Sequence, residues 1–248
     1  MFIDRVRILN GHFPGKDVYP FNLKIFRETD SLAFKAPVVF FVGENGSGKS
    51  TLLEALTRKY GLTVWGGEKS HIVHDNPYET RLFDFIDLEG TEPKGNIERG
   101  FLFRAENFFN YAAYLDDLIM TDPGLLEYYG GDSLTRQSHG QGFLSFFNAR
   151  CRIKGVYFLD EPEAALSPPN QLAFVKALWR IVQTGQGQFI ISTHSPIILS
   201  YPGAQIFSFD FIPIKSIPYT ETHSFRFYKD FMNNRTSYLK ELGPQVDE

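Results

Sequence analysis

The 248-residue chain has little cysteine and no apolar run long enough to cross a bilayer. Its single cysteine, Cys151, excludes an internal disulfide and is typical of a protein from a reducing compartment. The first residues, MFIDRVRILNG, carry charges inside their apolar stretch, which does not fit a signal peptide. We therefore expect a cytoplasmic protein with no transmembrane segment of its own.

The chain also lacks a strong excess of charge of either sign. Its formal net charge of -4 gives no global attraction to nucleic acid or anionic lipid. A local cluster of Arg150, Arg152 and Lys154 could bind the phosphates of DNA, although such clusters are usually solvated surface. Apolar side chains, by contrast, are plentiful: 43% of the residues are hydrophobic and 25 are phenylalanine, enough for a sizeable core.

Short apolar runs that alternate with helical patterns predict an α/β fold. The predicted buried strands are Pro37 to Val42, Val156 to Leu159 and Phe189 to Ser192. The predicted helices are Thr51 to Tyr60, Glu106 to Met120, Phe143 to Arg150 and Pro169 to Thr184. Because strands and helices alternate, we expect a mostly parallel sheet that binds ligands at its carboxyl edge.

Less regular segments flank this predicted core. Further strands are expected at Phe2 to Leu9, Tyr19 to Ile25, Gly100 to Arg104 and Gln205 to Phe211, and a helical end at His223 to Leu242. The apolar face predicted for the helix from Pro169 consists of Leu172, Val175, Leu178, Trp179 and Val182. The stretch from Gly61 to Gly100 is rich in glycine, proline and charge, and its sequence does not predict a clear order of helices and strands. Its histidines, His71 and His74, are interpreted as structural rather than metal-binding.

The segment GENGSGKS follows the first predicted strand and matches G-x-x-x-x-G-K-[ST] at every fixed position. Glycines let such a loop wrap phosphates with its N–H groups pointing inward. Lys49 adds a point charge for the outer phosphates, and Ser50 adds a hydroxyl for Mg²⁺, which prefers oxygen ligands. The candidate phosphate-binding residues are Gly43, Glu44, Asn45, Gly46, Ser47, Gly48, Lys49, Ser50 and Thr51.

Two carboxylates end the predicted strand VYFL. Asp160 can hold Mg²⁺ directly or through water, and Glu161 can orient or deprotonate a water that attacks a γ-phosphate. His194 follows the next predicted strand, so it reaches the same edge of the sheet. Each signal is common by itself, but together with a complete phosphate loop they favour a catalytic interpretation.

The small polar stretch QSHGQGF runs into the apolar FLSFF and looks like the start of a helix. The first turn of a helix presents unpaired N–H groups and a partial positive charge, which suit an anion. An ordinary helix capped by Ser138 explains the stretch equally well when it is taken alone.

In the order GENGSGKST, SHGQG, FLDEPEAALSP and ISTHSP, these four pieces resemble the ATP-binding cassette (ABC) superfamily. The sequences of these motifs resemble most those of the soluble RecF- and SMC-like ATPases, compact predicted ATPases of the AAA family. The resemblance implies an α/β P-loop NTPase fold with a mostly parallel sheet, an antiparallel β edge and an inserted helical lobe. It implies one domain over 1–248: a nucleotide-binding core at about 1–60 and 151–211, a lobe at about 100–150, and an extension at 212–248.

Carried over residue by residue, the resemblance implies Mg-dependent ATP hydrolysis with Lys49, Glu161 and His194 as catalytic residues. Ser138, Gly140 and Gln141 match the signature motif, in which His139 replaces the usual glycine. In that family two chains pack head to tail, and the signature of one caps the ATP held by the other. The resemblance thus implies an ATP-dependent homodimer.

Mg²⁺ ligation is expected from Ser50 and Asp160. The glutamine that usually senses the metal is missing, because no Gln lies between Ser50 and Arg136. Glu106 is our candidate for its place, with Asn107 next to it.

Three interpretations stay open on the sequence alone. The first is an ATP-gated dimer switch in DNA maintenance or defence, with a DNA or protein partner. The second is the ATP-binding subunit of a membrane transporter, and the third is a nucleotide sensor without turnover. Glu161 argues against the third, since a sensor needs no catalytic carboxylate. An adenine-stacking side chain is conceivable at Tyr19 or Phe21.

Overall fold

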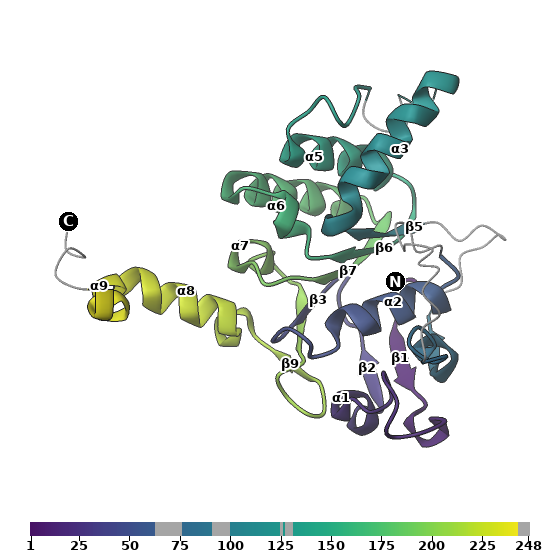
Figure 1. Cartoon of the computed structure of the whole chain (residues 1–248), viewed down its shortest axis with the longest axis vertical. Helices are drawn as coiled ribbons and strands as arrows, with labels where there is room; N and C mark the ends of the chain where they lie inside the picture. The colour runs from purple at the N-terminus through teal and green to yellow at the C-terminus, as the bar shows by residue number, and fades with distance from the viewer. Residues whose placement is uncertain (63–75, 91–99, 125, 127–130, 243–248) are drawn as a thin grey trace.

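The computed structural model describes residues 1–62, 76–90, 100–124, 126 and 131–242, and two sheets form its body (Figure 1). The larger sheet has the strand order β5-β6-β7-β3-β8-β9, with bounds Gly100–Arg104, Gly155–Asp160, Gly187–Ser192, Val38–Val42, Gln205–Ser208 and Lys215–Ile217. Its neighbours pair in parallel except β9, which is antiparallel to β8. The smaller sheet is antiparallel, with the order β2-β1-β4 and bounds Ser31–Ala33, Arg5–Ile8 and Ile86–Glu89.

Helices cover both faces of the larger sheet (Figure 1). The α-helices are α1 Lys24–Glu28, α2 Lys49–Lys59, α3 Phe108–Thr121, α5 His139–Arg150, α6 Pro168–Gln183, α7 Pro196–Leu199, α8 His223–Asn233 and α9 Arg235–Leu239. Short 3₁₀ turns are η1 Asn10–His12, η2 Leu82–Phe85, η3 Ala105–Asn107, η4 Pro162–Ala165, η5 Tyr219–Glu221 and η6 Lys240–Leu242.

The central strands are apolar throughout because the larger sheet is buried on both faces. Side chains alternate along a strand, so Val38 and Phe40 of β3 enter the core shared with α3, α5 and α6. Val39 and Phe41 enter a second core, shared with α2 and the smaller sheet. The helical lobe and the phosphate-loop helix therefore lie on opposite faces of one sheet.

Two glutamines tie the small sheet to the large one. The Gln188 side chain, 1% exposed on β7, accepts N–H groups of Phe2 and Ile3 and donates to the Ile3 carbonyl. Gln205 at the start of β8 accepts from the Lys35 N–H and donates to the Ala33 carbonyl. Each side-chain amide thus forms hydrogen bonds with main-chain N–H and C=O groups that would otherwise need water as a partner.

The predicted fold class is confirmed: a mixed α/β structure with a mostly parallel sheet and an antiparallel sheet. The predicted strand at Tyr19 to Ile25 is wrong. That segment forms a turn followed by α1, because Phe21 is fully buried against Phe13 and Phe85 rather than placed in a ladder. Strands β2, β4 and β9 were not predicted, since each is short and lies among turn residues.

The predicted apolar face of α6 is partly wrong. Leu172 and Trp179 are 46% and 44% exposed, whereas Phe174, Leu178 and Ile181 face the core. The buried stripe follows i, i+4, i+7 from Phe174, whereas Leu172 and Trp179 lie on the side of the helix that is turned away from this stripe.

Two further boundaries differ from expectation. The second lobe helix starts at His139 rather than Phe143, so the signature residues form its first turn. The helical end breaks at Asn234 into α8 and α9.

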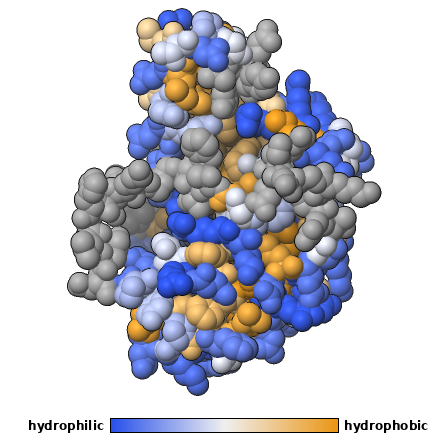
Figure 2. Space-filling view, turned by 90° about the vertical axis from the view of Figure 1, so that its right-hand side faces the viewer, coloured by the Kyte–Doolittle hydropathy of each residue, from blue (hydrophilic) through white to orange (hydrophobic). Residues whose placement is uncertain are grey.

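Figure 2 shows the face on the side of β5, where small apolar patches lie between hydrophilic side chains. His71 and His74 lie outside the described residues.

Candidate functional site

A glycine-rich loop joins β3 to α2 as predicted. Gly46 and Gly48 have φ angles of 78° and 100°, which L side chains rarely adopt. A Cβ at Gly48 would also come within 3.0 Å of the Phe26 ring. The loop thus bends tightly onto the first turn of α2, where free helix N–H groups suit an anion.

Lys49, the first residue of α2, is 4% exposed and reaches back over the loop. Its Nζ donates to the carbonyls of Gly43 at 2.7 Å and Glu44 at 2.9 Å. Burial lowers the pKa of Lys49, while the carboxylates of Glu161 and Asp160 oppose that shift. The amine is therefore held at the loop mouth, where an outer phosphate would meet it.

Ser50 and Asp160 come together from distant parts of the chain. Ser50 Oγ donates to Asp160 Oδ1 at 3.1 Å. Asp160 ends β6 and is 8% exposed; this burial raises its pKa, and the hydrogen bond from Ser50 and the charge of Arg104 oppose the shift. A hydroxyl and a buried carboxylate side by side are oxygen donors of the kind that Mg²⁺ prefers.

Sequence reasoning missed Arg104, which stands beside Asp160. The two residues are paired in register at the ends of β5 and β6, and Arg104 Nε lies 3.8 Å from Asp160 Oδ2. Arg104 Nη2 also pairs with Glu54 Oε2 of α2 at 2.5 Å, and Arg58 holds the other Glu54 oxygen at 2.8 Å. Although burial opposes it, these two arginines keep the pKa of Glu54 below its usual value.

Glu106, two residues further on, is exposed on η3. The contacts of the described residues bring Arg104, and not Glu106, to Asp160. Only the register between β5 and β6 could have revealed this, and that register is not visible in the sequence.

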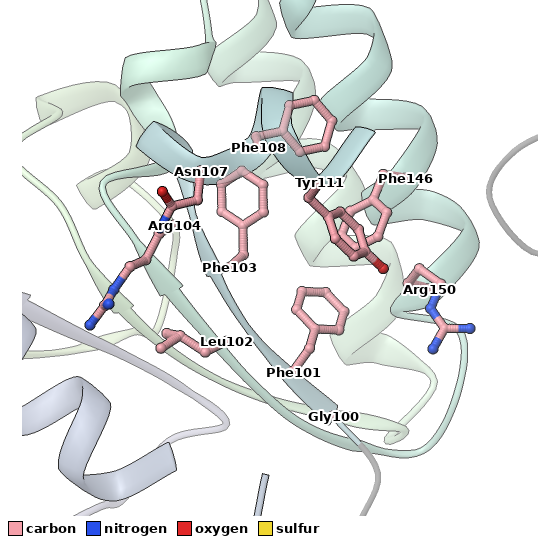
Figure 3. A pocket seen from close by; sticks show the side chains of 10 residues that line it. All are labelled: Gly100, Phe101, Leu102, Phe103, Arg104, Asn107, Phe108, Tyr111, Phe146 and Arg150. Carbon is pink, nitrogen blue, oxygen red and sulfur yellow. The ribbon is translucent and has the colours of Figure 1, made fainter. Parts of the chain in front are cut away.

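Arg104 also lines two cavities. One is lined by aromatic rings between β5 and the helical lobe, and in Figure 3 the Arg104 side chain extends away from those rings. The other cavity lies towards α2 and is lined in part by Ser50, Glu54 and Arg104. Arg104 thus contacts both the cavity beside the helical lobe and the cavity beside α2.

Glu161 follows Asp160 in a left-handed backbone conformation, with φ 49° and ψ 51°. Such a conformation is uncommon for a residue other than glycine and often marks a functional position. Its N–H donates to the Ser192 carbonyl at 2.9 Å, and its side chain is 49% exposed. Glu161 Oε1 lies 3.9 Å from His194 Nε2, so the two predicted catalytic side chains meet at the sheet edge.

A second missed residue, Glu163, fixes the backbone at His194. Its carboxylate accepts from Thr193 Oγ1 at 2.7 Å and from the His194 N–H at 2.6 Å. Burial raises the pKa of Glu163, against these hydrogen bonds. The EAALSP segment is therefore joined to the residues after β7.

The signature residues start α5 and are built as an exposed cap. Ser138 Oγ donates to Gln141 Oε1 at 2.8 Å, and both side chains are exposed. Gly140 is buried, and a Cβ there would lie 2.3 Å from Asn170 Nδ2. Because α5 packs on the face of the sheet opposite α2, this cap is not part of the phosphate pocket of its own chain (Figure 1).

The two aromatic candidates for base stacking differ. Tyr19 lines the pocket at the phosphate loop, where its hydroxyl lies 2.6 Å from Thr51 Oγ1. Phe21 is fully buried in the second core. Of the two, Tyr19 is therefore the side chain that a nucleotide could reach.

This loop at the carboxyl edge of a parallel sheet is the arrangement of a P-loop ATPase. A family model described as an AAA ATPase domain matches residues 69–199, more than half of the chain, so the chain belongs to this family of ATPases. A second model, described as an AAA domain, matches residues 21–98. No curated protein matches the sequence.

Solved structures show the same fold at low sequence identity. An SMC head bound to the C-terminal winged-helix domain of ScpA is 13% identical, with a TM-score of 0.51 over 88% of this chain and 98% of that one. The ATP-binding cassette of an ABC transporter in its ADP conformation is 16% identical, with a TM-score of 0.50 over 98% and 100%.

No helix within the described ranges is both long enough and apolar enough to span a membrane.

Proposed function

We propose that this ATPase is an ATP-gated switch, in which two copies pack head to tail around two ATP molecules and separate after hydrolysis. The loop from Gly43 to Thr51 binds the phosphates of ATP through its N–H groups, and Lys49 contacts the outer phosphates. The Tyr19 ring is placed to contact the base. Residues 1–60 and 151–211 form the nucleotide-binding core in this proposal, and 100–150 the lobe.

Ser50 and Asp160 would hold Mg²⁺, which supplies charge neutralisation at the phosphate oxygens when it is bound. Glu161, half exposed beside the pocket, orients the attacking water and accepts its proton. His194 contacts the γ-phosphate from the neighbouring strand. Arg104 positions Asp160 and Glu54, while Glu106, on the exposed turn that follows, stays a prediction as a metal ligand.

The observation that carries the dimer proposal is the position of the signature. Ser138 and Gln141 are exposed, and their helix lies across the sheet from the phosphate-loop helix of the same chain. A phosphate bound at this helix start must therefore come from another molecule. A two-fold pair in which each signature faces the other loop forms both sites at once.

The test is the Glu161→Gln variant, which keeps the side-chain size and removes the base. We expect ATP turnover to fall about 10²- to 10⁴-fold, and the variant to form a stable dimer with ATP and Mg²⁺. Light scattering after gel filtration measures the mass, and phosphate release measures turnover. A variant that binds ATP and nevertheless stays a monomer would contradict the proposal.

The matched control adds Lys49→Ala to the same variant. Without the loop cation ATP binds poorly, so the double variant should remain a monomer at the same ATP concentration. A dimer that forms regardless of Lys49 would show that association does not depend on the nucleotide.

We further propose that the switch serves DNA maintenance or defence. The shared fold with an SMC head supports this choice at the level of architecture only. Turnover measured with and without double-stranded DNA is the test, and stimulation by DNA is the expected result. Co-purification with an integral membrane protein, without any response to DNA, would favour the alternative of a transporter subunit.

A further inference from the structure

A helical arm extends from the body of the molecule (Figure 1). We define the arm as residues 223–239, that is α8 and α9. None of its residues is buried, although the residue before it, Thr222, is 1% exposed. The arm thus begins at an anchored point and then leaves the protein surface.

The anchor lies at the ATP site. His223 Nδ1 is 3.9 Å from Glu44 Oε1 of the phosphate loop. The Tyr219 hydroxyl donates at 3.0 Å to the carbonyl of Pro196, two residues after His194. Thr222 Oγ1 accepts from the Phe225 N–H and so caps the start of α8. The base of the arm therefore lies beside the phosphate loop and beside the segment that follows His194.

Beyond the anchor the arm carries an aromatic stripe on one side. The rings of Phe227 and Phe231 stack at 6.2 Å, and Tyr238 of α9 folds back onto both. Much of this stripe faces water: the exposed fractions are 45% for Phe227, 50% for Tyr228, 70% for Met232 and 46% for Tyr238.

An exposed aromatic stripe of this kind is expected to pack against another surface. Isolated helices of this length are marginal in water, and amphipathic helices in proteins owe most of their stability to packing of the apolar face. A contiguous exposed apolar patch on a projecting element commonly marks an interaction site.

We propose that the arm of each chain packs its stripe against the second copy of this chain in the ATP-bound dimer. This inference rests on the function proposed above. The copy that covers the phosphate loop must approach Glu44. The first residue of the arm, His223, lies 3.9 Å from Glu44, so the arm runs alongside that copy. Two-fold symmetry makes the contact reciprocal, so each arm packs against the other chain.

The charges on the other side of α8 favour a protein surface over a membrane. Arg226 and Lys229 lie there with Asp230, which accepts hydrogen bonds from Asn234 and Tyr238. Helices that lie on anionic lipid carry a polar face rich in Lys and Arg. A mixed polar face with an aromatic stripe is more typical of a contact between proteins.

The test compares two neighbouring substitutions in the Glu161→Gln background. Met232→Asp places a charge in the stripe, whereas Asn233→Asp places the same charge on the polar side of the same helical turn. Both positions are exposed, so neither change affects the core, and any effect on the helix end is shared. Dimer dissociation constants come from sedimentation velocity with ATP and Mg²⁺, and ATP affinity from titration at low protein concentration.

We expect Met232→Asp to raise the dimer dissociation constant at least tenfold, with Asn233→Asp within twofold of the parent and ATP affinity unchanged in both. Equal dimerisation of the two variants would overturn the assignment of the arm while leaving the proposed switch intact. A parent that never dimerises removes the proposed function and the inference with it. Binding of the wild-type chain to phosphatidylserine vesicles that Met232→Asp abolishes, with the dimer unaffected, would assign the arm to lipid and also overturn it.

Discussion

The phosphate-loop side and the signature side of the proposed ATP site are built in different ways. On the loop side, Lys49 and Asp160 are buried; Lys49 donates hydrogen bonds to the loop, and Asp160 accepts one from the exposed Ser50. On the signature side, Ser138 and Gln141 are exposed, and within the described residues their side chains form hydrogen bonds only with each other.

This difference shows which half is complete in a single chain. Hydrogen bonds that hold Lys49 and Asp160 in place organise the phosphate contacts before ATP arrives, which is the basis of electrostatic preorganisation. A self-capped helix start can release its N–H groups to an anion when a neighbour brings one. The loop side should thus bind nucleotide alone, and the signature side should act only in the dimer.

The largest expected effect is on the loop side. Lys49→Ala should lower ATP turnover about 10²- to 10³-fold and weaken ATP binding, because it removes the buried cation at the phosphates. Phosphate release and calorimetric titration with ATP measure the two effects. Lys59→Ala at the other end of α2, where Lys59 Nζ lies 3.5 Å from Asp87, is the matched control and should leave both unchanged. Equal losses in the two variants would argue against a specific role for Lys49.

On the signature side, Ser138→Glu should lower turnover about 10²-fold by repelling the γ-phosphate, with ATP affinity of the monomer unchanged. Asn148→Glu, exposed near the other end of α5, serves as control. Mixing the Ser138→Glu and Lys49→Ala chains should restore part of the activity, because a hybrid dimer keeps one intact composite site. A mixture as inactive as its components would speak against sites shared between chains.

A smaller effect should come from Arg104, which joins the two sides of the sheet. Arg104→Ala should lower turnover about tenfold to a hundredfold and raise the Mg²⁺ concentration needed for half-maximal activity, since Asp160 loses the cation that orients it. Arg58→Ala is the control, because Arg58 also pairs with Glu54, whereas Arg104 is the arginine that pairs with Asp160. If both variants respond alike, Arg104 acts through Glu54 and not through Asp160.

The smallest effect concerns how the signature helix packs. A Cβ at Gly142 would lie 2.9 Å from the Leu134 carbonyl, whereas one at Gly140 would meet the movable amide of Asn170. Gly142→Ala should therefore be less stable than Gly140→Ala by about 1–2 kcal/mol in the free energy of unfolding. Urea denaturation of both variants measures this difference. A Gly140→Ala protein that is the less stable of the two would show that Asn170 cannot move aside.

The sequence by itself determined the strand–loop–helix order at Gly43 to Thr51, the buried strands before Asp160 and His194, and the P-loop ATPase class. These features are local: a G-x-x-x-x-G-K-S spacing and a run of apolar residues have the same meaning wherever the chain carries them. The same locality explains the misassigned strand at Tyr19 to Ile25, where alternation alone could not show that Phe21 packs into a core.

Only the tertiary structure decided which side chains meet. Arg104 reaches Asp160 through the register of β5 on β6, and Glu163 reaches the backbone of His194 from η4, 31 residues earlier in the chain. The same holds for the separation of α5 from α2 by the sheet, for the exposed Trp179 and for the projecting arm. Strand register and helix packing depend on contacts between residues far apart in the chain, which no local pattern records.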